Sequence, residues 1–223
     1  MRVGILPRFP GMWLLVAALA MPGGLSLSGS AGAQGRAPVE PYTATQPTTL
    51  VVFADHSMED REWQALFTAL RTEVAQGSAE TSRLDRHPVL LRGDAIKPGM
   101  EVNSALVVYL HGDCGLTWPP PGKPVPGKPL GWTLSAGGRI EPFAHVDCTE
   151  IGQVLGPRAL AMGRERRNST MAGAMARVIL HEWIHIATQS PAHTGHGISK
   201  AEFNEADLNG DNQDRTKGTD NSR

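Results

Sequence analysis

Near its carboxyl end the chain contains a metal-hydrolase motif, His181-Glu182-Trp183-Ile184-His185. Residues four positions apart share one face of an α-helix, so the imidazoles of His181 and His185 can reach a single metal ion. The carboxylate of Glu182 can then act on a water in the open coordination position of the metal. The spacing therefore predicts a helix that carries a catalytic Zn²⁺ site, with His181 and His185 as metal ligands and Glu182 as the general base.

The third protein ligand that a catalytic zinc normally needs has three candidates in this sequence. His193 follows a helix-terminating run, Gln189-Ser190-Pro191, after which the chain can turn back toward the motif. His196 lies three residues further on, and Glu205 follows at the longer spacing that is typical of thermolysin-like enzymes. We expect His193 to be the third ligand, with His196 and then Glu205 as the alternatives.

The run from His181 to Ile198 resembles uncharacterised bacterial zincin-like proteins, which look like distant relatives of the metzincins. Their pattern is H-E-x-x-H, a short apolar stretch, Ser, and then His-[Ser/Thr]-x-x-Gly-[Ile/Leu]. On this pattern His193 takes the ligand position. The chain differs from metzincins proper at Pro191, which stands at their third histidine, and at Ser199, where a methionine would follow. The resemblance implies a zincin-like fold with a zinc site. It also implies peptidase activity.

The predicted function is that of an exported zinc metallopeptidase acting on a peptide or protein substrate. Glu182 would take a proton from the zinc-bound water as it attacks the scissile carbonyl, and would deliver the proton to the leaving amine. The alternative is a non-catalytic binding module on a degenerate zincin scaffold, in which the zinc is structural. A formal net charge of −1 gives no electrostatic basis for nucleic-acid binding. The sequence leaves the oligomeric state open.

Apolar periodicity predicts the elements that must position the motif. Residues 48–54 and 105–110 have the composition of buried strands, and 88–91 that of a short strand. A hairpin is expected around residues 136–138, since glycines there separate two strand-like runs. Helical spacing is found in residues 59–74 and from 171 into the motif. The expected fold is α+β and zincin-like: an N-terminal mixed β-sheet with a packed helix, followed by a long active-site helix that carries H-E-x-x-H.

Two shorter stretches are expected to interrupt the helical second half. Gly156-Pro157 should break the helical pattern that begins near Thr149, because proline lacks the backbone N–H that a helix needs. The basic run from Arg164 to Arg167 is expected to be a loop before the long helix.

The domain organisation follows from composition. Residues 1–33 are predicted to be a signal peptide, since a short apolar run is followed by the small-residue cleavage pattern Ala31-Gly32-Ala33. Residues 34–47 are predicted to be a linker, 48–207 the zincin-like metallopeptidase domain, and 208–223 a disordered tail. The apolar run is too short to span a bilayer, so no stable membrane span is expected after signal cleavage. A secreted or periplasmic location is expected.

The chain has two cysteines, Cys114 and Cys148, which can form a disulfide in an oxidising compartment. The alternative is a pair of buried free thiols. Beside the cysteines, a second group of polar residues could be a site or could be ordinary turn residues, and we favour the turn residues. This group consists of His111, Asp113, His145 and Asp147.

Overall fold

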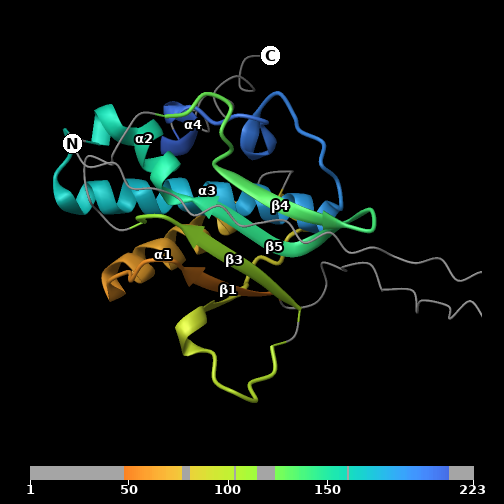
Figure 1. The fold of residues 1–223 in the computed structure, drawn as a ribbon. Helices are drawn as coiled ribbons and strands as arrows, with labels where there is room; N and C mark the ends of the chain where they lie inside the picture. Colours follow the sequence, from red (N-terminus) through yellow and green to blue (C-terminus); the bar gives the residue numbers. More distant parts are fainter. Residues whose placement is uncertain (1–47, 77–80, 103, 115–123, 160, 211–223) are drawn as a thin grey trace, which may run out of the picture. The chain divides into compact units, whose positions relative to one another are not determined.

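Five strands form one mixed sheet in the computed structural model, with the spatial order β2-β1-β3-β5-β4 (Figure 1). The strands are β1 (Thr49–Ala54), β2 (Val89–Arg92), β3 (Ala105–His111), β4 (Gly131–Ala136) and β5 (Arg139–Asp147). Strands β2, β1, β3 and β5 run parallel, and β4 pairs antiparallel with β5 through a tight hairpin. The antiparallel strand β4 therefore lies at one edge of the sheet.

The structure describes residues 48–76, 81–102, 104–114, 124–159 and 161–210. The predicted signal peptide (1–33) and linker (34–47) lie outside the described residues, as do residues 211–223 of the predicted tail. Among the described residues, no helix is both long and apolar enough to cross a membrane.

Helices α1 and α3 pack on each other and against the apolar face of the sheet (Figure 1). The helices are α1 (Asp60–Gln76), α2 (Cys148–Ala159), α3 (Arg164–Thr188) and α4 (Glu205–Asn209), with short 3₁₀ turns η1 (Thr81–Arg83), η2 (Gly93–Ala95) and η3 (Gly197–Ser199). Strand side chains alternate between the two faces of the sheet, and in β3 it is Leu106, Val108 and Leu110 that are buried. Trp183 of α3 is fully buried in the same core.

The α+β class, with a mixed sheet and a packed helix, is confirmed. The strand pairing also shows that the hairpin turn lies at residues 136–139, as expected. The two predicted interruptions of the helices are wrong. Helix α2 continues through Gly156-Pro157 to Ala159, and Arg164 to Arg167 form the first turn of α3. Arginine has a high helix propensity, so a basic run is compatible with the first turn of α3.

The fold extends slightly beyond residue 207, the expected end of the domain. Asn204 caps α4 with a reciprocal pair of hydrogen bonds: its side chain accepts from the backbone of Asp207, whose carboxylate accepts from the backbone of Asn204. Leu208 is fully buried. Its burial anchors the short helix, which ends at Asn209 because Gly210 follows in the left-handed conformation, with a φ of 78°.

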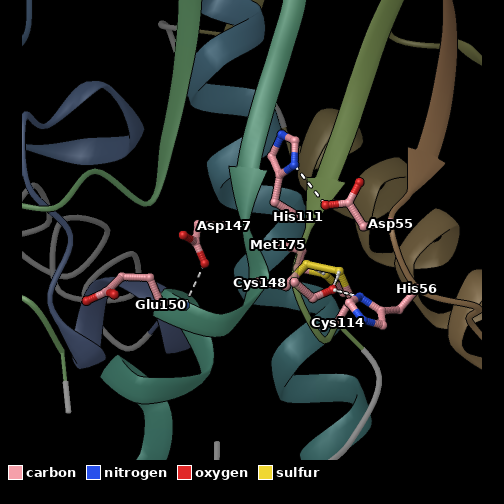
Figure 2. Close-up of a disulfide and its surroundings, with 9 residues drawn as sticks. Asp55, His56, His111, Cys114, Asp147, Cys148, Glu150 and Met175 are labelled. Atoms are coloured by element: carbon pink, nitrogen blue, oxygen red, sulfur yellow. Dashed lines mark hydrogen bonds and ion pairs between the residues drawn. A yellow bond between two sulfur atoms is a disulfide. The ribbon is translucent and has the colours of Figure 1, made fainter. Parts of the chain in front are cut away.

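The predicted disulfide is present and joins Cys114, just beyond β3, to Cys148, the first residue of α2 (Figure 2). Both cysteines are buried, and Cys148 also lies 3.5 Å from the sulfur of Met175 in α3. The bond therefore ties the ends of two neighbouring parallel strands to the helix layer.

Removal of this disulfide should lower stability measurably. The bond spans a sequence separation of 34 residues, so it restricts a long loop in the unfolded chain. We expect the double variant Cys114→Ala/Cys148→Ala to lose about 3 kcal/mol of unfolding free energy in urea titrations. An unfolding midpoint equal to that of the wild type would contradict this expectation.

Candidate metal centre

Three histidine side chains converge at the carboxyl-terminal end of α3. His181 and His185 lie one turn apart on this helix, and their Nε2 atoms are 3.0 Å apart. His193, from the segment that follows the helix, brings its Nε2 within 3.2 Å of the Nε2 of His185. One ligand nitrogen from each residue lies within 4.8 Å of the other two, so the three could hold a metal ion together.

Two backbone carbonyls fix the protonation of the rings on α3. The Nδ1–H of His181 donates to the carbonyl of Ile198 at 2.7 Å, and that of His185 donates to the carbonyl of Ser190 at 2.6 Å. A carbonyl oxygen can only accept, so the proton of each neutral imidazole must lie on Nδ1. Each Nε2 atom therefore presents its lone pair, which is the form that binds a metal.

Such an arrangement fits a cation. Two neutral imidazole nitrogens whose lone pairs face each other at 3.0 Å repel one another unless a positive charge lies between them. Burial lowers the pKa of His181 to about 4, which keeps its ring neutral near neutral pH. Burial and the neighbouring His185 also lower the pKa of His193.

The structure separates the three candidates for a third ligand. His193 joins the cluster although its side chain is exposed, while His181 and His185 are each only 6% exposed. Neither His196 nor Glu205 belongs to this group of converging nitrogens. His196 is exposed in the turn beyond His193, and Glu205 begins α4.

The short turn η3 contacts the histidine cluster through its backbone. The carbonyl of Ile198 in this turn accepts from His181, and the backbone of Ser199, which is buried, accepts from the N–H of Thr194. On the other side, the ring of Phe203 meets the ring of His181 edge to face, with centroids 5.4 Å apart. Backbone and aromatic contacts thus hold His181 from two directions.

Glu182 lies on the same helix beside the cluster and is only 4% exposed. Burial raises the pKa of its carboxyl to about 8. A cation held by the neighbouring histidines would favour the ionised carboxylate and so act against this shift. Glu182 therefore holds its carboxyl proton near neutral pH. A nearby cation would make this proton easier to release.

The edge strand β4 lies close to α3 at Gly131. A Cβ atom at this position would lie 2.6 Å from Cγ1 of Val178 and 2.9 Å from Oε1 of Glu182. Only glycine lets the backbone come so near to the helix. Gly131 thus limits where the carboxylate of Glu182 can lie.

These residues line one cleft with a volume of about 460 Å³. Its floor is α3, with His181, Glu182 and His185. One wall is formed by residues 124–133, which run into β4, and the other wall contains His193 and residues 201–203. The three histidines and Glu182 therefore face a space that a ligand could enter.

The second group of polar residues divides into two parts in the structure. His111 and His145, on neighbouring strands, are joined nitrogen to nitrogen at 2.8 Å, and Nδ1 of His111 is 3.0 Å from a carboxylate oxygen of Asp55 (Figure 2). Asp147 instead pairs with Lys128 at 2.7 Å. Trp132 of β4 stacks on His145 with an angle of 4° between the rings, so the histidine pair is part of a row of stacked rings across the strands.

Sequence reasoning did not find several residues that shape the site. The carbonyls of Ser190 and Ile198 carry no residue-specific signal, since any residue supplies a carbonyl. The helix-terminating run predicts where α3 ends but not the role of Gln189 there: its side chain bonds both the N–H and the carbonyl of Ile140, which fastens the end of α3 to β5. Gly131 did carry a signal, because a glycine at the start of a strand often marks a close backbone approach.

The chain matches no protein-family model, no curated protein and no solved structure.

Substitution of Gly131 by alanine should disturb Glu182 without removing the histidine cluster. The new methyl group would collide with Val178 and with the carboxylate, so either β4 or Glu182 must move. We expect Gly131→Ala to lower the thermal midpoint by several degrees and to leave metal binding by the histidines in place. Gly163→Ala is the matched control, because Gly163 also has no positive φ but has open space around it. Equal effects of the two substitutions would show that the approach of β4 to α3 is unimportant.

Proposed function

We propose that this chain is an exported zinc peptidase with a zincin-like fold. The observation that carries the proposal is the convergence of three imidazole nitrogens in a cleft that also contains the carboxylate of Glu182. Three neutral nitrogen ligands suit Zn²⁺ and leave a fourth position open, as in catalytic zinc sites. The H-E-x-x-H motif on a long helix supports the same class of protein.

Each of the three histidines would supply one ligand to the ion. His181 and His185 supply two Nε2 lone pairs whose directions are fixed by the carbonyls of Ile198 and Ser190. His193 closes the ligand set from the exposed side of the cleft. Bound zinc would supply Lewis acidity, which lowers the pKa of a coordinated water and polarises the carbonyl of a substrate.

Glu182 would act as the general base and then as the general acid. Its carboxylate takes a proton from the attacking water and later gives this proton to the leaving amine. The low exposure of Glu182 and the close backbone of Gly131 restrict the orientation of its carboxylate. Less entropy is therefore lost when the carboxylate adopts its reactive orientation.

Strand β4 would hold the peptide. Within the described residues β4 pairs only with β5, and Gly131, Trp132 and Thr133 of this edge line the cleft. An extended peptide could add to this edge by backbone hydrogen bonds, which would place its carbonyl groups along the floor formed by α3. The disulfide supports export, because such bonds persist in oxidising compartments.

Metal analysis tests the ligand set. We expect about one zinc per chain in the wild type, as in other single catalytic sites. His193→Ala should lose most of this zinc, whereas His196→Ala and Glu205→Ala should retain it, since neither side chain is part of the cluster. Zinc loss in the Glu205 variant alone, measured side by side with the others, would assign the third ligand to Glu205.

Glu182→Gln tests catalysis separately from metal binding. The amide is close in size to the carboxylate but cannot take a proton, so peptide hydrolysis should fall by at least about 100-fold. Zinc stoichiometry should stay at the wild-type level, because Glu182 is not among the converging ligands. Full zinc loading without cleavage of any peptide by the wild type would instead favour a binding module with a structural zinc.

A further inference from the structure

We propose that the end of the cleft beside α2 takes a lysine or arginine side chain of the bound peptide. This inference rests on the proposed peptidase function and names the class of substrate for the same site. It is carried by three features of the described residues: apolar walls, an excess of carboxylates, and a buried glutamate held in one position.

The walls at this end are apolar. Val178 of α3 lies one helical turn before Glu182. The same cleft is lined by Val154 of α2 and by Leu130, which directly precedes β4. Such walls suit the methylene stem of a long side chain, whose charged head must then reach a polar partner.

Carboxylates outnumber cations around that space. Among the described side chains that line the cleft, Glu150, Glu182 and Glu202 stand against the single ammonium of Lys128. Zinc would offset the charge near Glu182, but Glu150 belongs to α2 and Glu202 to the opposite wall. At the end of the cleft beside α2, the ammonium of Lys128 faces two carboxylates, those of Asp147 and Glu150, so this end favours a positive guest over a negative one.

Lys128 leaves Glu150 incompletely neutralised. Its ammonium lies 2.7 Å from Asp147 but 3.5 Å from Oε2 of Glu150, so its closer bond is to Asp147. The pKa of Lys128 is raised, mainly by its hydrogen bond to Asp147, so the ammonium remains charged. One cation thus serves two carboxylates, and its contact with Glu150 is the longer of the two.

Glu150 is also held in place before any ligand arrives. Its Oε1 accepts from the backbone N–H of Val125 at 2.6 Å, and its own N–H donates to Asp147 at 2.9 Å (Figure 2). The side chain is only 3% exposed, so a cation that pairs with it meets little competing water. An ion pair in such a place discriminates between charged and neutral guests more strongly than one on the surface.

The test measures peptide binding to the zinc-loaded Glu182→Gln variant, which binds without cleaving. Fluorescein-labelled alanine octapeptides carry lysine, leucine or glutamate at each position in turn, and fluorescence anisotropy gives the dissociation constants. At one position we expect lysine to bind about tenfold more tightly than glutamate, with leucine between them.

Two further substitutions should change this preference in opposite directions. Glu150→Gln keeps an oxygen for the N–H of Val125 but removes the charge, so the lysine preference should fall close to onefold. Lys128→Met removes the competing cation, so the preference should rise. Glu165→Gln is the matched control, because Glu165 is exposed in the first turn of α3 and does not line the cleft.

Each result decides a separate claim. Equal binding of all peptides, or a lysine preference that Glu150→Gln leaves unchanged, overturns this inference even if the wild type cleaves peptides. A lysine preference that depends on Glu150, in a wild type that cleaves none of the peptides, overturns the peptidase function and keeps the basic subsite. Should Glu150→Gln fail to fold, Lys128→Met alone still decides, because a preference that falls or stays the same contradicts the proposal.

Discussion

The facing lone pairs of His181 and His185 are the constraint around which the carboxyl-terminal half of this chain is built. With carbonyl acceptors at both Nδ1 positions, two neutral rings have unprotonated Nε2 atoms that face each other at 3.0 Å. Such a pair is unfavourable alone and favourable around a cation, so a bound cation would stabilise the path that the chain takes beyond α3. That path begins at Gln189, which adopts a left-handed conformation and fastens the helix end to Ile140.

The same turn delivers three different groups to the site. Gln189 ends α3, the carbonyl of Ser190 then accepts from His185, and His193 returns toward the helix. Because the second carbonyl comes from Ile198 in η3, the whole segment between these residues closes around the two rings. The position of His193, the tautomers of the two rings and the chain reversal are therefore consequences of one local structure, and a change in any of them would affect the other two.

The sequence was a good guide to this site where side-chain type determines the outcome. The spacing of His181 and His185 requires only a helix, and the apolar periodicity before the motif predicts one. The sequence was a poor guide where the backbone determines the outcome, as with the acceptors for both rings. It also misjudged Arg164 to Arg167, since local charge does not show that the rest of a long helix is stabilised by a buried face. Strand order is a tertiary property, so the edge position of β4 could not be read from the hairpin signal alone.

The end of β5 connects the fold to the chemistry of the cleft. Within four residues it provides Asp147, which holds Lys128; Cys148, which forms the disulfide; and Glu150, which faces the cleft. The disulfide joins the start of α2 to the residue that lies just beyond β3. Glu150, two residues after Cys148, accepts from the backbone N–H of Val125. The segment that forms the cleft wall is thus held to α2 by charge and hydrogen bonds, while Gly131 holds the following strand against α3. These contacts hold the cleft wall in one place, and on the proposed function they would allow one side chain of a bound peptide to be selected by shape and charge together.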